Sequence, residues 1–124
     1  MSLLLDTHVV IWFLEGNARL GVAARTAIQE AERVYVSAAT VWEISVKMAQ
    51  GKLRAPADFA ERLLDQGMLQ LGLEWEHARI AGSLPALHRD PFDRMLVAQS
   101  IVERLTIVTR DAMFERYGVP VIAA

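Results

Sequence analysis

Four acidic residues lie just after expected strands or in the first turns of expected helices. Asp6 and Asp111 follow strands, and Glu43 and Asp93 lie near the starts of helices. Hard cations such as Mg²⁺ and Mn²⁺ prefer oxygen ligands, so a group of carboxylates could hold one of them. A cation held in this way lowers the pKa of a bound water and stabilises charge on a phosphate. The chemistry that such a group predicts is metal-dependent hydrolysis of a phosphodiester.

Each acid also has a structural explanation, because each lies near the start of an expected helix. Asp6 and Asp111 could cap helices, Thr40–Glu43 has the form of a capping box, and Asp90 is a good N-cap that leaves Asp93 near the helix dipole. The set is harder to explain by capping, since two charges about 5 Å apart repel by roughly 3 kcal/mol at an effective dielectric of about 20. Several gathered carboxylates therefore need protons or cations.

The elements that must position these acids alternate between short β-rich runs and longer helical patterns, which predicts a parallel sheet covered by helices. Residues 91–104 carry little polar surface, so this helix should be central and mostly buried. Ligands of open parallel sheets bind beyond the carboxyl ends of the strands, so we expect all four acids to face one crevice. The expected strands are 3–5, 34–36, 69–71, 106–109 and 119–122, and the expected helices are 8–14, 22–31, 39–50, one after Pro56 that ends near Gly67, 74–83, 91–104 and 111–117.

Length and composition restrict the class of protein. With 124 residues, 53% of them hydrophobic, the chain should form one compact domain, 1–124. It has no cysteine, no run of about 20 apolar residues and no recognisable signal peptide, so we expect a cytoplasmic protein with no membrane contact. Its net charge of −2 argues against a protein that coats nucleic acid by electrostatics alone.

Four segments of the chain together resemble the acidic blocks of the PIN-domain family. The closest likeness is to the VapC-type toxins that carry a DPFDR block, which here is Asp90 to Arg94. The blocks stand in family order at family-like spacing and cover nearly the whole chain. They are Leu4-Leu5-Asp6-Thr7-His8, Ala39-Thr40-Val41-Trp42-Glu43-Ile44, the run from His88 to Gln99, and Val108-Thr109-Arg110-Asp111.

The resemblance implies a three-layer α/β/α fold with a central parallel sheet, and an endoribonuclease that uses Mg²⁺ or Mn²⁺ to activate water. Asp6, Glu43 and Asp93 match the three core acids of the family, and Asp111 matches a fourth, more variable one. These four are therefore the expected catalytic and metal-binding residues. Asp90 belongs to its block, but its place before a proline favours a helix cap over a metal ligand.

The same resemblance implies partners. They are an RNA substrate, a cognate antitoxin protein that inhibits the toxin, and a second copy of the chain in a homodimer. Thr7 and Thr109 fall where the family places supporting hydroxyl groups. A silent PIN-like adapter is the main alternative, and the intact set of acids argues against it.

Several other residues could mislead. His8, His77 and His88 lack the short ligand spacing of a zinc site, and for His88 we favour a supporting or capping role. Arg94 and Arg110 stand beside core acids, where they could orient a carboxylate or bind a phosphate. Three tryptophans, at positions 12, 42 and 75, are expected in the core or at an interface rather than stacked on bases.

Two other classes that place acids beyond strand ends fit poorly. A receiver domain would have an acceptor aspartate after a middle strand and a lysine late in the chain, but no aspartate follows residues 34–36 and no lysine follows Lys52. A haloacid-dehalogenase-type phosphatase would have a second aspartate two places after Asp6, where His8 stands.

Overall fold

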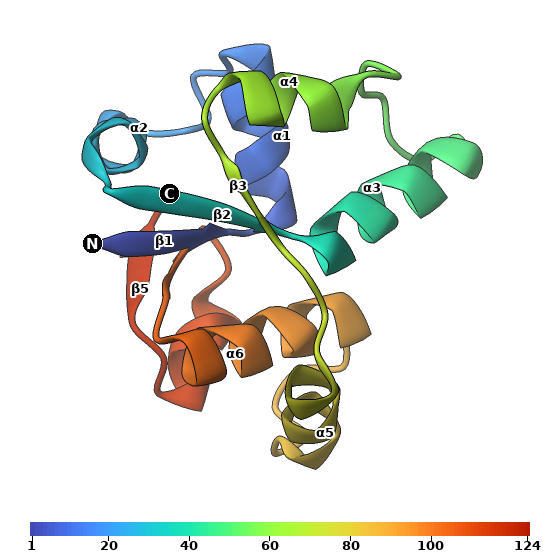
Figure 1. The fold of residues 1–124 in the computed structure, drawn as a ribbon, viewed down its shortest axis with the longest axis vertical. Coiled ribbons are helices and arrows are strands. Elements are labelled where there is room, and N and C mark those ends of the chain that lie inside the picture. Colours follow the sequence, from blue (N-terminus) through green and yellow to red (C-terminus); the bar gives the residue numbers. More distant parts are fainter.

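Five short strands form one sheet in which every neighbouring pair is parallel, as a computed structural model of residues 1–124 shows (Figure 1). The strand order is β3-β2-β1-β4-β5. Leu4 of the central strand pairs with Tyr35 on one side and Ile107 on the other. The strands are β1 (Ser2–Leu5), β2 (Arg33–Ser37), β3 (Leu69–Leu71), β4 (Thr106–Thr109) and β5 (Val121–Ala123).

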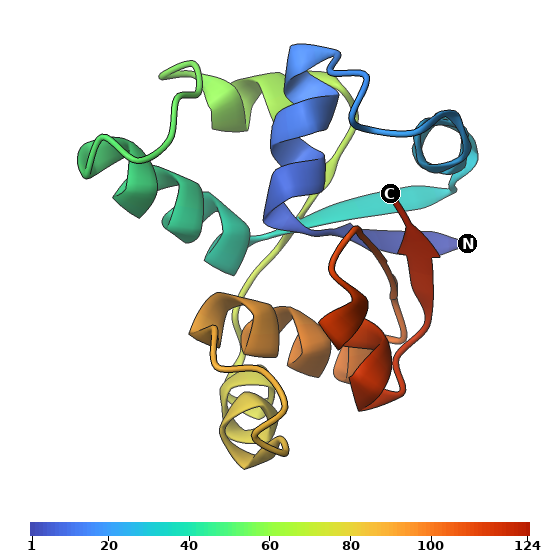
Figure 2. The ribbon, with the colours of Figure 1, turned by 180° about the vertical axis from the view of Figure 1, so that it is seen from behind.

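Helices cover both faces of this sheet (Figures 1 and 2). One face carries α1 (Thr7–Glu15), α2 (Val22–Glu30) and α4 (Phe59–Asp65), and the other carries α6 (Pro91–Glu103) and the 3₁₀ helix η1 (Ala112–Tyr117). Helix α5 (Trp75–Ser83) packs against α6 (Figure 1). Helix α3 (Ala38–Ala49) contacts both α1 and α6. The three-layer α/β/α fold with a central parallel sheet is thereby confirmed.

The two cores follow from the alternation of side chains along β1. Leu3 and Leu5 point into a cluster of 15 buried residues shared with α1, α2 and α4. Leu4 points the other way, into a cluster of seven that includes Leu96 and Phe114. Because β1 is buried on both faces, its sequence is a continuous apolar run.

The expected elements are all present, with ends shifted by a few residues. The last strand begins at Val121 rather than at residue 119, because Pro120 has no N–H to donate to a neighbouring strand. The last helix is a 3₁₀ helix. The central helix is less buried than predicted, because five of its 13 residues, Leu96 to Ser100, are buried and Ile101 is 44% exposed. None of the helices combines the length and the apolar character that crossing a membrane requires.

Candidate active site

The four predicted acids lie together in one cleft at the carboxyl edge of the sheet. Asp6 follows β1 and caps α1, and Asp111 follows β4 and caps η1. Glu43 lies in the second turn of α3, and Asp93 lies in the first turn of α6. The cleft has a volume of about 380 Å³, and Asp90 contributes a fifth carboxylate to its lining.

Asp6 and Glu43 form the buried wall of the cleft, with exposed fractions of 7% and 4%. The Thr109 hydroxyl donates to Asp6 Oδ2 over 2.7 Å, and the Thr7 backbone N–H donates to Asp6 Oδ1 over 2.7 Å. The Thr7 hydroxyl donates to Glu43 Oε1 over 2.5 Å. Burial raises the pKa of Asp6, although the hydrogen bonds from Thr109 and Thr7 act in the opposite direction. Thr7 and Thr109 thus support acids, as the resemblance implied.

Asp93 is the most perturbed of the acids. Burial raises its pKa to about 8, and repulsion from the nearby carboxylates of Asp6, Asp90, Glu43 and Asp111 adds to this effect. At neutral pH, Asp93 of the metal-free protein therefore tends to keep a proton. A carboxyl group whose charge is disfavoured in this way is typical of a functional site that a cation completes.

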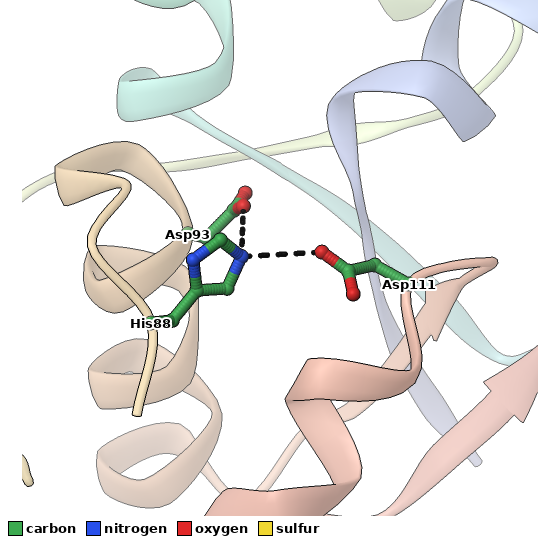
Figure 3. A group of neighbouring side chains, drawn as sticks. All are labelled: His88, Asp93 and Asp111. Carbon is green, nitrogen blue, oxygen red and sulfur yellow. Dashed lines mark hydrogen bonds and ion pairs between the residues drawn. The ribbon is translucent and has the colours of Figure 1, made fainter. Parts of the chain in front are cut away.

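His88 lies between two of the acids, in keeping with the supporting role that the sequence favoured for it. Its Nε2 is 2.8 Å from Asp93 Oδ2 and 3.1 Å from Asp111 Oδ2 (Figure 3). Its Nδ1 accepts the backbone N–H of Asp90 over 3.3 Å, which favours the tautomer that carries the proton on Nε2. His88, Asp93 and Asp111 also bring one ligand atom each within 4.8 Å of one another. The only signal in the sequence was the position of His88 just before the capping Asp90.

Asp90 caps α6, as predicted. Its Oδ1 accepts the backbone N–H groups of Phe92 over 2.8 Å and of Asp93 over 3.2 Å. The proposed capping box at Thr40–Glu43 is wrong, because α3 begins earlier and Ser37 caps it by accepting from the Ala39 N–H. Thr40 lies inside the helix with its hydroxyl buried and unpaired.

The two arginines differ from expectation. Arg94 points away from the acids and donates to four backbone carbonyls, that of Ala81 in α5 and those of Leu84, Pro85 and His88 in the α5–α6 connection. Neither predicted role therefore applies to it. Arg110 lines the cleft, but its guanidinium donates to the carbonyls of Ala124 and Arg19 and lies 4.5 Å from the ring of Trp12.

The tryptophans are mostly outside the core. Trp42 is 60% exposed and Trp75 is 94% exposed, so a core position is wrong for both. Trp42 makes an edge-on contact with Phe92, with ring centroids 5.1 Å apart. Only Trp12 packs against the larger core cluster. An interface role for the two exposed tryptophans stays a prediction.

Comparison with known proteins is consistent with this geometry. Residues 3–120 match the family model described as the PIN domain. The chain belongs to the PIN-domain family. Ribonuclease VapC22 of Mycobacterium tuberculosis is 28% identical to this PIN domain over 122 residues, which is 96% of this chain and 94% of that protein.

Two solved structures share the fold of this PIN domain. One is a chain of VapBC2 from Rickettsia felis bound to a DNA fragment from its promoter, with a TM-score of 0.73, 13% identity and coverage of 99% and 98% of the two chains. The other is a chain of DNA-bound VapBC from Salmonella typhimurium, with a TM-score of 0.73, 19% identity and the same coverage.

The ligand atoms of the cleft fit a hard divalent cation. They are carboxylate oxygens with one imidazole nitrogen beside them, and the chain has no thiolate to favour a softer metal. Four side chains already contact these acids as hydrogen-bond donors or cations, namely Thr7, Thr109, Lys47 and His88. The single ammonium group of Lys47 does not balance the five carboxylates of the cleft, so the site favours additional positive charge.

Proposed function

We propose that this PIN domain is an endoribonuclease that depends on Mg²⁺ or Mn²⁺, and that it is the toxin of a toxin–antitoxin pair. The observation that carries the proposal is the convergence of acids from four separate segments on one cleft, with the pKa of Asp93 raised to about 8. The likeness to Ribonuclease VapC22 over almost the whole chain supports RNA as the substrate.

In the proposed mechanism, Asp6, Glu43, Asp93 and Asp111 hold one or two divalent cations. When bound, such a cation supplies acidity to a water molecule and neutralises charge on the scissile phosphate. Thr7 and Thr109 position the carboxylates of Glu43 and Asp6 by donating hydroxyl hydrogen bonds to them. His88 orients Asp93 and Asp111 through Nε2. No side chain of the chain has to act as a nucleophile.

The experiment is an incubation of the purified chain, freed of any co-purifying partner, with total cellular RNA and a DNA control. EDTA, Mg²⁺ and Mn²⁺ define the conditions, and an Asp6→Asn protein is tested alongside. We expect discrete RNA fragments only with metal and only from the unsubstituted chain. Absence of cleavage in a folded, metal-binding protein would favour the adapter, and cleavage that survives EDTA would indicate a contaminant.

The antitoxin is proposed from the relatives that are found in VapBC complexes. A cleft lined by five acids would bind a basic side chain of an inhibitor, and a homodimer is a further expectation. Co-expression with the product of the neighbouring gene should restore the growth of cells that produce the chain. Light scattering of the purified protein would measure its oligomeric state. If no inhibitory partner can be found, the toxin role is contradicted while the nuclease stands.

A further inference from the structure

Lys47 lies inside the acid cleft, and the proposed function gives it no role. It is one helical turn beyond Glu43 on α3, and its Nζ lies 2.5 Å from Glu43 Oε2. The Glu43 side chain is 5% exposed and that of Lys47 is 37% exposed, so the pair lies at the cleft and not on a solvated helix face. The chain has one other lysine, Lys52, which is exposed and forms no ion pair.

Two strongly basic side chains line the cleft, and Lys47 is the one that forms an ion pair with an acid there. The other, Arg110, donates instead to the carbonyls of Ala124 and Arg19. Both carboxylate oxygens of Glu43 are in use, Oε1 by the Thr7 hydroxyl and Oε2 by Lys47. A divalent cation that bound Glu43 would therefore meet the Lys47 ammonium at the same carboxylate, where two positive charges repel.

We propose that Lys47 is a positioning residue that acts as the resident counter-ion of Glu43 in the metal-free protein and turns to a backbone phosphate of RNA when a divalent cation binds. Its four-carbon stem is flexible, and its partial exposure leaves its ammonium group room to move within the cleft. When a divalent cation occupies the acids, a phosphate of bound RNA would lie beside it. That phosphate is the anion with which the displaced Lys47 ammonium could then pair. The phosphate role rests on the proposed nuclease function, whereas the counter-ion role does not.

The first test measures Mn²⁺ binding to RNA-free protein by calorimetry, with Lys47→Met compared against Lys52→Met, which changes the net charge equally. Removing a competing cation should tighten Mn²⁺ binding by about three- to tenfold in the Lys47 variant and by less than about twofold in the Lys52 variant. Lys47→Arg should restore the weaker binding. Equal or weaker Mn²⁺ binding by a folded Lys47→Met protein would overturn the counter-ion role.

A second measurement needs no substitution at all. The chain has two lysines, so the ammonium signals of Lys47 and Lys52 can be told apart by ¹⁵N NMR. Titration with Mg²⁺ should move the Lys47 signal to saturation and leave the Lys52 signal in place. A Lys47 signal that does not shift while Mg²⁺ binds would overturn the proposal, even if Lys47→Met failed to fold.

The phosphate role is tested with an RNA oligonucleotide that contains a cleavage site. Lys47→Met should raise KM by about tenfold while kcat changes by less than about threefold, since the lost contact is made in both the bound and the reacting complex. An unchanged KM would overturn this role. If the unsubstituted chain cleaves nothing but Lys47→Met still tightens Mn²⁺ binding, the counter-ion role holds and the nuclease function falls together with the phosphate role.

Discussion

At the scale of single residues, the site is a group of carboxylates that disfavour one another's charge. The charge of Asp93 is the most disfavoured, because its side chain is only 15% exposed and has four acidic neighbours, and this combination raises its pKa to about 8. The His88 Nε2 lies 2.8 Å from Asp93 Oδ2, while the Thr7 and Thr109 hydroxyls donate to the neighbouring acids Glu43 and Asp6. The gathered acids therefore lower the free energy of unfolding of the metal-free protein, so unfolding experiments can report on the site.

Replacing Asp93 by Asn should abolish metal-dependent RNA cleavage and stabilise the metal-free protein. Folding of the parent at neutral pH requires Asp93 to take up a proton, because its pKa rises from 3.8 to about 8, whereas an amide of the same shape folds without one. The substitution should therefore add about 1 to 3 kcal/mol to the free energy of unfolding. Urea denaturation at neutral pH in EDTA measures this gain. The exposed Asp65→Asn is the matched control and should stay within about 0.5 kcal/mol of the parent. Cleavage at the normal rate by Asp93→Asn would contradict the proposed site.

The stability gap between Asp93→Asn and the parent should depend on pH. The pKa of Asp93 is 3.8 in a model compound and about 8 in the folded protein, so below pH 4 both folded and unfolded chains hold its proton. Between these values the folded state holds the additional proton, and its stability falls as the pH rises. The advantage of Asp93→Asn should thus be near zero at low pH, grow towards pH 8 and then level off. Urea midpoints across this range test it, and a constant gap would show that the perturbed pKa is not the cause.

At the scale of secondary-structure elements, helix starts place the acids and the same residues stabilise those starts. Asp6, Asp90 and Asp111 each accept a backbone N–H at the beginning of a helix. The positive end of the helix dipole stabilises a negative charge there. Capping and metal binding, which are alternatives for an acid considered alone, are therefore compatible in this fold, and Asp90 is the residue at which they can be separated.

Asp90 should behave as a cap and not as a ligand. Its Oδ1 already accepts from two N–H groups of α6, so Asp90→Ala should lower the free energy of unfolding by about 1 kcal/mol. Asn is an equally good N-cap, so Asp90→Asn should keep both stability and Mn²⁺ binding. Calorimetric Mn²⁺ titration alongside chemical denaturation of the two variants makes the comparison. A loss of Mn²⁺ binding in a stable Asp90→Asn protein would instead assign Asp90 as a ligand.

At the scale of the whole molecule, the sheet divides the interior into a larger and a smaller core, and the site depends on the smaller one. Phe114 of η1 is fully buried in that core, and its ring lies 6.3 Å from the His88 ring in an edge-on arrangement. Since His88 contacts both Asp93 and Asp111, packing behind the sheet helps to position the acids.

Truncation of Phe114 should therefore affect both stability and the site. Phe114→Ala should cost about 3 to 5 kcal/mol, the range for deletion of a large buried aromatic side chain. Phe92→Ala, at a half-buried position of α6, is the control and should cost less. Thermal or urea unfolding gives the cost, and the imidazole NMR signals of His88 report the change at the site. A decrease of less than about 1 kcal/mol in the free energy of unfolding would show that Phe114 does not stabilise the smaller core as predicted.

The sequence by itself determined the layers of the fold and the acids of the site. Alternating β-rich and helical runs, the buried run of β1 and the acids after strand ends are local features, and a parallel sheet brings strand ends to one edge whatever else the chain does. The match of residues 3–120 to the PIN-domain family agrees with this fold, and the metal-binding role of the four acids stays a prediction. The single-domain prediction and the DPFDR subgroup stay predictions.

Only the tertiary structure decided which side chains reach the acids. Arg94 is adjacent to Asp93 in sequence, yet it donates to carbonyls of α5 and of the α5–α6 connection because neighbours on a helix point in different directions. His88 and Lys47 do reach the acids, one from a loop before α6 and the other from one turn beyond Glu43. Such contacts join segments far apart in the chain, and their geometry depends on how the elements pack. Local sequence patterns do not contain that information.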